Sequence, residues 1–340
     1  MPGRRKAVAV LKFVARVLFL PILLGTAGFA QTTMNDVHVV PRQISPSMAN
    51  AVASSRVVEG SVLHVLKTDV KLVLVPVSVT DPKQRLVTGL RAENFELFEG
   101  KKPQEIRHFS SEDMPVSVGI ILDISGSMRN KMNRVRDAVN QFCETANPQD
   151  EFFMVEFSDR PLLVTDFTTA PEDLQKELLF TQPKGRTALL DAIYMGLRKM
   201  KDARYAKKAL LIISDGGDNH SLYTEKDVKA AAKESDVMIY GIGTFDRYAP
   251  TPEETRGPAL LSEIAEPTGG QAFTLENEKE LAAVATHIGK ALRTQYVLGY
   301  RPDELPRDGK WHKIEVKLRL PKKLAFLRAR AKTGYYAPAE

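Results

Sequence analysis

The sequence predicts an α/β protein built on a doubly wound, mostly parallel sheet of Rossmann-like topology, with flanking β segments that form a β-sandwich. Between residues 113 and 295, short apolar runs alternate with amphipathic stretches of helical periodicity. Such alternation is typical of parallel strands joined by helices. The runs at 116–123 and 209–214 are almost continuously apolar, which indicates strands covered on both faces. On both sides of this region apolar and polar residues alternate, which indicates antiparallel strands.

The chain divides into five parts by composition and periodicity. Its 340 residues are enough for one large domain and a smaller one. We expect a signal peptide (1–30), a linker (31–66), an N-terminal β segment (67–112), the α/β domain (113–295) and a C-terminal β segment (296–340). The linker is expected because its Thr, Asn, Ser and Pro residues show no sustained periodicity.

The first part has the features of an export signal. Arg4, Arg5 and Lys6 precede an apolar stretch at 17–24, and small residues follow as far as Ala30. This order predicts a secretory signal peptide cut near Ala30, and therefore a periplasmic or secreted protein with no transmembrane span after cleavage. The alternative is a retained membrane anchor, although the apolar stretch is shorter than the about 20 residues that span a bilayer unaided.

The charge of the chain argues against a nucleic-acid partner. There are 48 Lys and Arg residues against 42 Asp and Glu, but five of the basic residues lie in the first 30, where there is no acid. The remaining 43 basic and 42 acidic residues nearly cancel, so overall charge gives no reason to expect nucleic-acid binding. Residues 301–340 alone carry a charge of +6, which indicates either a solvated sheet face or a surface for an anionic partner.

The single cysteine, Cys143, excludes an intramolecular disulfide. It shares an apolar helical face with Val135, Val139 and Phe142, which predicts a buried structural thiol and not a reactive one. An exported protein without disulfides fits a bacterial envelope or secreted protein better than a eukaryotic ectodomain.

Apolar residues that repeat every 2 residues predict the strands of the α/β domain, and those that repeat every 3.6 residues predict its helices. The expected strands are 116–123, 152–157, 162–167 as a hairpin partner, 209–214, 237–243 and 271–274. The expected helices are 130–145, 171–180, 188–201, 225–235, 258–266 and 278–294.

The flanking segments contain short strands only. In the first segment we expect strands at 73–79, 85–87, 95–98 and 105–109, and in the second at 314–320 and 325–331. Because neither set could form a stable domain alone, we expect 69–110 and 296–336 to combine into one β-sandwich, with the α/β domain inserted between them. The alternative is two separate β extensions that pack on the α/β domain.

Polar residues follow two of the apolar strands, at the edge where ligands bind in open α/β sheets. Asp123 ends the first strand and is followed by Ser125 and Ser127, with Gly126 between them to allow a sharp turn. Asp215 ends the run at 209–214. Carboxylate and hydroxyl oxygens suit Mg²⁺, Mn²⁺ or Ca²⁺ and do not suit Zn²⁺. The alternative is that these residues only cap helices and turns.

These motifs resemble the metal ion-dependent adhesion site of the von Willebrand factor A family. The resemblance covers residues 115–295 and rests on Asp123-Ile124-Ser125-Gly126-Ser127, on Thr187 in a Gly-Arg-Thr loop before a helix, and on Ser214-Asp215-Gly216. Ser214 departs from the usual Thr of the third motif. In the flanking segments the residues at 94–99 and 334–336 are similar to those of bacterial exported proteins of acidobacterial type that are related to this family.

The resemblance implies a site and a class of partner. The implied metal ligands are Asp123, Ser125, Ser127, Thr187 and Asp215, and the implied cofactor is Mg²⁺, with Mn²⁺ or Ca²⁺ as alternatives. The open coordination position would take an Asp or Glu carboxylate from a protein partner. Asp218 and His220 either support the site from outside or lie in a solvated loop. The loop at 245–257 is expected to lie on the same edge and to set partner specificity.

The sequence therefore favours an exported, divalent-cation-dependent protein-binding or adhesion module that is not an enzyme. A Mg²⁺-dependent hydrolase or phosphatase is an alternative, but such an enzyme needs a second acid two residues after the first, and that position is Ser125. A structural envelope protein whose domain has no metal role is a further alternative. The sequence leaves the partner and the oligomeric state open.

Overall fold

The predicted fold class is confirmed by the computed structural model, which describes residues 72–215, 217–244, 252–275, 277–302 and 308–337. The expected signal peptide and linker, and most of the loop at 245–257, lie outside these ranges. In the described part no helix is long and apolar enough to cross a membrane.

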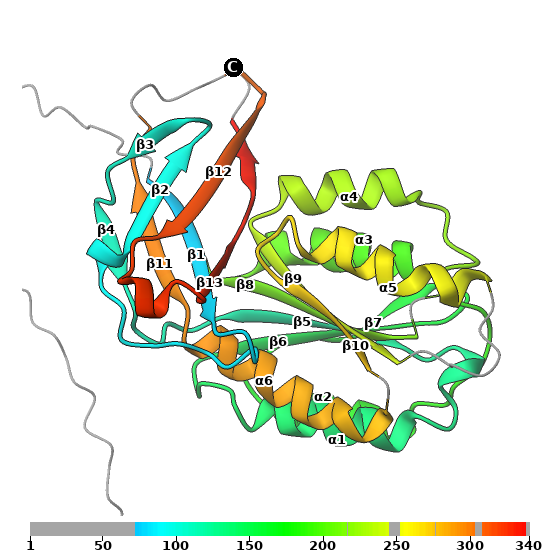
Figure 1. Cartoon of the computed structure of the whole chain (residues 1–340). Coiled ribbons are helices and arrows are strands. Elements are labelled where there is room, and N and C mark those ends of the chain that lie inside the picture. Colours follow the sequence, from blue (N-terminus) through cyan, green and yellow to red (C-terminus); the bar gives the residue numbers. More distant parts are fainter. Residues whose placement is uncertain (1–71, 216, 245–251, 276, 303–307, 338–340) are drawn as a thin grey trace, which may run out of the picture. The chain divides into compact units, whose positions relative to one another are not determined.

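A six-stranded sheet forms the centre of the α/β domain, in the order β10-β9-β8-β5-β6-β7 (Figure 1). Its strands are β5 (Ser117–Asp123), β6 (Glu151–Phe157), β7 (Pro161–Thr168), β8 (Lys208–Ser214), β9 (Val237–Thr244) and β10 (Gln271–Leu275). All neighbours are parallel except β7, which pairs with β6 as the expected antiparallel hairpin partner. The central strand β5 is buried along its whole length, as its apolar run predicts.

Six α-helices cover the two faces of this sheet, three on each (Figure 1). One face carries α1 (Met132–Cys143), α2 (Pro171–Phe180) and α6 (Leu281–Arg293), and the other carries α3 (Leu189–Lys199), α4 (Glu225–Glu234) and α5 (Pro252–Ala265). Gly119 in β5 permits close packing, because a Cβ there would lie 2.3 Å from the ring of Phe153. Cys143 is buried as predicted, and burial raises the pKa of its thiol to about 12, so the thiol is inert.

Two sheets of four strands form the β-sandwich, and each contains strands from both flanking segments. Their orders are β13-β1-β11-β4 and β14-β12-β2-β3. The strands are β1 (Val73–Thr80), β2 (Phe95–Glu99), β3 (Lys102–Gln104), β4 (His108–Ser110), β11 (Tyr296–Tyr300), β12 (Trp311–Leu318), β13 (Arg328–Ala331) and β14 (Gly334–Tyr336). Alternate residues such as Val75, Leu97, Leu298 and Ile314 meet in one apolar core between the sheets.

The sequence expectations differ from the structure at three places. Helix α5 begins at Pro252, six residues before the expected start, and Pro258 lies inside it. The expected strand at 85–87 is only an isolated bridge between Thr80 and Leu86. Of the expected strand at 105–109 only the last two residues are in a strand, β4, while β3 ends at Gln104. The alternation of short apolar pieces does not show where the chain crosses from one sheet to the other.

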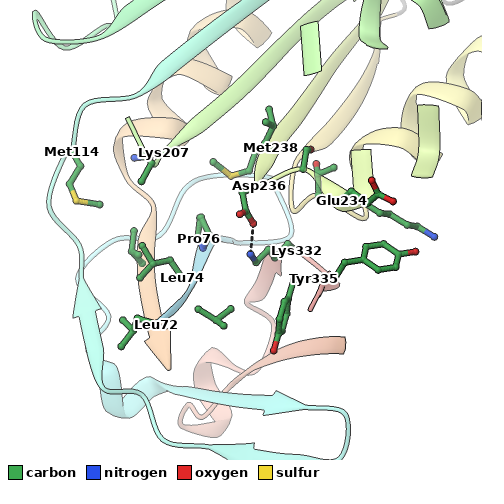
Figure 2. A pocket seen from close by; sticks show the side chains of 18 of the residues that line it. Leu72, Leu74, Pro76, Met114, Lys207, Glu234, Asp236, Met238, Lys332 and Tyr335 are labelled. Carbon is green, nitrogen blue, oxygen red and sulfur yellow. Dashed lines mark hydrogen bonds and ion pairs between the residues drawn. The ribbon is translucent and has the colours of Figure 1, made fainter. Parts of the chain in front are cut away.

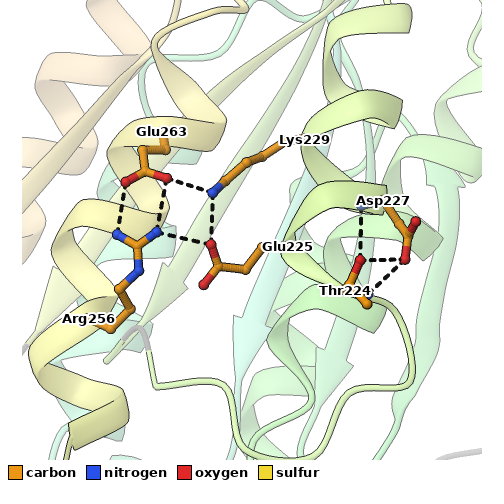
Figure 3. A network of polar contacts seen from close by, with 6 residues as sticks. All are labelled: Thr224, Glu225, Asp227, Lys229, Arg256 and Glu263. Atoms are coloured by element: carbon orange, nitrogen blue, oxygen red, sulfur yellow. Dashed lines mark hydrogen bonds and ion pairs between the residues drawn. The ribbon is translucent and has the colours of Figure 1, made fainter.

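Helices α4 and α5 are joined by a network of charged side chains (Figure 3). Arg256 of α5 contacts Glu263 at 2.8 Å and Glu225 of α4 at 3.0 Å, and Lys229 contacts both acids. Arg256 and Lys229 together lower the pKa of Glu263 to about 2. Arg256 of this network lies in the first part of α5, which the sequence analysis assigned to a loop.

The sandwich packs against the amino ends of the central strands. Gln295, between α6 and β11, is 1% exposed and its amide donates to Tyr240 Oη at 3.3 Å. Lys332 of the sandwich forms an ion pair of 2.8 Å with Asp236, directly before β9. The same ion pair borders a pocket of about 380 Å³ at this junction (Figure 2). The opposite edge of the sheet, where the predicted site lies, is free of the sandwich (Figure 1).

Candidate functional site

The two predicted acids lie at the carboxyl ends of adjacent parallel strands. Asp123 is the last residue of β5 and Asp215 follows β8, and these two strands pair along their length. Both carboxylates are almost completely buried, at 0% and 1% exposure. Neither forms an ion pair with a basic side chain of the described residues.

The two serines of the first motif connect these acids. The Ser125 amide donates to Asp123 Oδ1 at 2.8 Å, and the hydroxyls of Ser125 and Ser127 lie 3.1 Å apart. The Ser127 hydroxyl in turn donates to Asp215 Oδ2. The chain can turn this sharply because a 3-10 helix (Gly126–Met128) follows at once. Four of the five predicted site residues therefore form one chain of hydrogen bonds.

Thr187 lies in a loop that is fastened to the first motif through the backbone. The Lys184 amide donates to the Ile124 carbonyl at 2.8 Å, and the Gly126 amide donates to the Gly185 carbonyl at 3.1 Å. Gly185 has a φ of +83°, and a Cβ there would lie 2.7 Å from the Asp159 carboxylate, so the loop needs glycine at this position.

Thr187 itself is held by the loop that follows β8. It is buried, and its amide donates to Asn219 Oδ1 at 3.0 Å. Its carbonyl accepts from the amides of Asn219 and His220 at 3.0 and 3.1 Å. The structure thus places all three predicted loops together, with Thr187 joined to the other four residues through backbone contacts.

Residues other than the five predicted ligands also organise the site. The Ser214 hydroxyl donates to Asp123 Oδ2 at 2.6 Å. Serine at this position, where the family usually has threonine, therefore still supplies the hydroxyl that holds Asp123. Asp218 accepts from the Leu190 amide at 3.2 Å and from the Ser221 hydroxyl at 2.6 Å, which ties its loop to the start of α3. Asn219 could have been suspected only from its position in a polar loop after a strand.

Two buried, charged carboxylates are electrostatically unfavourable at this site without a positive charge beside them. Burial, reinforced by the negative charge of Asp215, raises the pKa of Asp123 to about 7. A divalent cation would remove this penalty, because it supplies the positive charge that no side chain provides. No group of three or more His, Cys, Asp or Glu side chains able to hold a metal occurs in the described ranges, so a cation here would rely on hydroxyl as well as carboxylate oxygens. That mixture is chemically suited to Mg²⁺.

The fold and this site define an α/β domain with a polar centre at the carboxyl edge of its sheet. Comparison with known families identifies the class of this domain. Residues 118–217 match the family model for the von Willebrand factor type A domain. The α/β region of this chain is therefore a von Willebrand factor type A domain.

Two relatives have sequences similar to about half of this chain. The inter-alpha-trypsin inhibitor heavy chain H4 of Bos taurus is 24% identical over 191 residues, which are 51% of this chain and 20% of that protein. An uncharacterized protein of Borreliella burgdorferi is 24% identical over 183 residues, which are 47% of this chain and 53% of that protein. The match thus spans about a fifth and about half of the lengths of these relatives.

Solved structures with a similar arrangement include two bacterial ones. A von Willebrand factor type A protein from Catenulispora acidiphila is 15% identical with a TM-score of 0.47, covering 80% of this chain and 64% of its own. The vWF domain of the type V pili tip protein Mfa5 from Porphyromonas gingivalis is 13% identical with a TM-score of 0.42, covering 53% of this chain and 95% of its own.

Proposed function

We propose that this protein is a divalent-cation-dependent protein-binding module of the cell exterior or periplasm. Asp123, Ser125, Ser127, Thr187 and Asp215 would hold the ion, with Mg²⁺ as the expected cation and Mn²⁺ or Ca²⁺ as substitutes. The observation that carries this proposal is the pair of buried carboxylates without a basic partner in the described part of the chain. Domains of this family mediate protein–protein interaction.

The charge balance of the proposed site suggests the chemistry of the partner. Asp123 and Asp215 together neutralise a divalent ion, and the hydroxyls of Ser125, Ser127 and Thr187 are neutral. A coordination position left open on such an ion favours an oxygen ligand from outside, and an Asp or Glu of another protein supplies a charged one. Ser127 is exposed to solvent, which supports an open coordination position on that side of the site.

Calorimetric titration with Mg²⁺ and Mn²⁺ tests the proposal directly. We expect heat of binding for the wild type, and no heat for Asp123→Ala or Asp215→Ala, because each change removes half of the negative ligand charge. Asp137→Ala, on the exposed side of α1, is the matched control and should bind like the wild type. A wild-type protein that gives no heat, and whose melting temperature is the same in Mg²⁺ and in chelator, would refute the metal site.

Binding is favoured over hydrolysis by the residue two places after Asp123. A phosphatase of this arrangement needs a general acid there, and Ser125 instead uses its amide and hydroxyl to join the two acids. Measurable, Mg²⁺-dependent release of phosphate from a generic aryl phosphate, lost in Asp123→Ala, would contradict a purely binding role.

The proposal also includes export, because residues 1–30 have the pattern of a signal peptide. Expression in a bacterial host should give a periplasmic or secreted protein whose amino end is near Gln31. Amino-terminal sequencing that finds Met1 or Pro2 on a cytoplasmic protein would refute export.

A further inference from the structure

Four large apolar side chains near the candidate site are unusually exposed to solvent. Leu162, Leu179, Phe180 and Leu222 are 63%, 70%, 80% and 92% exposed, and the other exposed large apolar side chains in the described ranges reach at most 50%. Scattered apolar residues are ordinary on protein surfaces. These four, however, all lie in segments that adjoin the site, which indicates a surface made for contact.

Three of these side chains lie on the β6 side of the site. Leu162 pairs with Glu156 near the carboxyl end of β6, and Leu179 precedes Phe180 at the end of α2. Phe180, Ile124 and Lys184 line a hollow of about 300 Å³. Since Ile124 belongs to the first site loop, this hollow borders the loop that carries Asp123 and Ser125.

Three basic side chains near the site form no ion pair with any residue that the structure describes. Arg129 follows the 3-10 helix of the first loop, Arg160 lies in the turn between β6 and β7, and Lys184 lines the hollow. All three are exposed, and none forms an ion pair with a described residue. By contrast, Arg186 of the same region is already paired with Asp159 at 3.4 Å. The three unpaired cations are therefore available to an external anion.

The acids of this region do not cancel that charge. Glu156 is 9% exposed and accepts from the Thr181 hydroxyl, which leaves Glu177 as the one exposed acid among the residues that line the hollow. Glu253 and Glu254 begin α5 beside Gly217, on the β8 side of β5. Phe180, Arg160 and Lys184 thus lie on the β6 side of the site, and Glu253 and Glu254 lie on the β8 side.

We propose that Arg129, Arg160, Leu162, Leu179, Phe180 and Lys184, here named the rim surface, bind an acidic segment of a partner protein that also carries apolar side chains. This inference rests on the proposed function. One carboxylate of the segment completes the coordination of the ion, further carboxylates pair with the three cations, and an apolar side chain enters the hollow beside Phe180. Charge complementarity selects the segment, and burial of Phe180 contributes to affinity.

An anionic membrane is the other surface that cations and exposed apolar groups could meet. A partner protein fits better because the apolar side chains surround a recessed site whose carboxylates are buried, so a flat lipid surface could not reach the ion. Vesicle binding is therefore included as an outcome of the test.

The test uses the mature chain and four short synthetic peptides, each with one central Asp. The Asp is flanked by Glu with Phe and Leu, by Glu with Gly and Ser, by Lys with Phe and Leu, or by Gly and Ser alone. Fluorescence anisotropy in Mn²⁺ should give the acidic, apolar peptide the lowest Kd, about tenfold or more below the others. Chelator should abolish this binding.

Matched variants separate the rim surface from the rest of the protein. Phe180→Ser should remove the preference for apolar flanks, and Lys184→Glu should weaken binding of the Glu-containing peptides, both with unchanged Mn²⁺ calorimetry. Phe326→Ser and Lys322→Glu change exposed residues of the same kinds on the sandwich and should have no effect.

The outcomes distinguish the two proposals. If Mn²⁺ gives no heat of binding, the proposed function fails and the rim proposal fails with it. If Mn²⁺ binds but no peptide binds, or the flanks make no difference, or Phe180→Ser changes nothing, the rim proposal alone is overturned. Binding to phosphatidylglycerol vesicles that is stronger than peptide binding and is lost in Phe180→Ser would also overturn it, in favour of a membrane surface.

Discussion

Asp150 and Asp123 are nearly fully buried acids at opposite ends of the same sheet, and their surroundings differ in one respect. Asp150, at the amino end, is paired with Arg293 at 3.1 Å and accepts from the Val116 amide at 2.8 Å. Asp123, at the carboxyl end, has hydroxyl and amide donors, a second acid close by and no basic partner in the described ranges. The first acid is neutralised inside the protein, whereas no described basic side chain neutralises the second, and the proposed cation would supply that charge.

The surfaces around the amino and carboxyl ends of the sheet differ in the same way as these two acids do. The amino end is covered by the sandwich, with Lys332 and Asp236 paired across the junction. The carboxyl end has exposed Phe180 and Leu222, together with exposed cations that form no ion pair with a described residue. A buried charge that is paired within the fold serves stability, whereas one left unpaired at an open edge is better explained by a ligand.

The largest expected effect comes from breaking the pairing at the amino end. Arg293→Met should lower the free energy of unfolding by about 3 kcal/mol, because it leaves Asp150 buried without a counter-charge. Urea denaturation at neutral pH measures this. A loss below about 1 kcal/mol would mean that the amide donors to Asp150 suffice and that the contrast between the two ends is weaker than we infer.

The next effect comes from supplying the missing charge at the carboxyl end. Mg²⁺ at a hundred times its Kd should stabilise the wild type by about 2.7 kcal/mol, and it should leave Asp215→Ala unchanged. Denaturation in Mg²⁺ and in chelator gives the difference. Equal stabilisation of both proteins would place the cation elsewhere.

The two ends should respond with opposite signs to removal of charge. In chelator, Asp123→Asn should raise the free energy of unfolding by about 1 kcal/mol, because it removes repulsion with Asp215 and keeps an acceptor for the Ser125 amide. The same change should abolish Mg²⁺ binding. If Asp123→Asn destabilises the metal-free protein, its hydrogen bonds outweigh the repulsion and the site does not depend on a cation.

The smallest effect concerns Lys207, a basic residue at the amino end. It is 6% exposed, its ammonium group donates to the Leu292 carbonyl, and burial lowers its pKa to about 8. Between pH 8 and pH 9 the unfolded chain keeps a proton that the folded chain has lost, so stability should rise with pH, by about 1 kcal/mol. Lys207→Met should lose this rise when unfolding is measured at both pH values. An identical rise in the variant would assign it to other groups.

Local sequence patterns predicted most helices and strands and the first loop of the candidate site. Helix α2 has the bounds that its periodicity predicts, because Pro171 and the acids after it mark a helix start. Asp123, Ser125 and Ser127 were recognisable because two-residue spacing after a buried strand brings them into one loop. Ser214 and Asn219 were harder to recognise, since single polar residues in loops are common and their partners are far away in the sequence.

The sequence by itself determined most strands and helices and the first site loop, because these depend on periodicities and spacings within a few residues. Only the tertiary structure decided that Thr187 joins that loop and that Arg293 neutralises Asp150. It also decided that β1 and β11 pair across more than two hundred intervening residues. Contacts of this kind depend on how whole elements pack, and no local pattern encodes them, because the same polar side chain suits a solvated loop equally well.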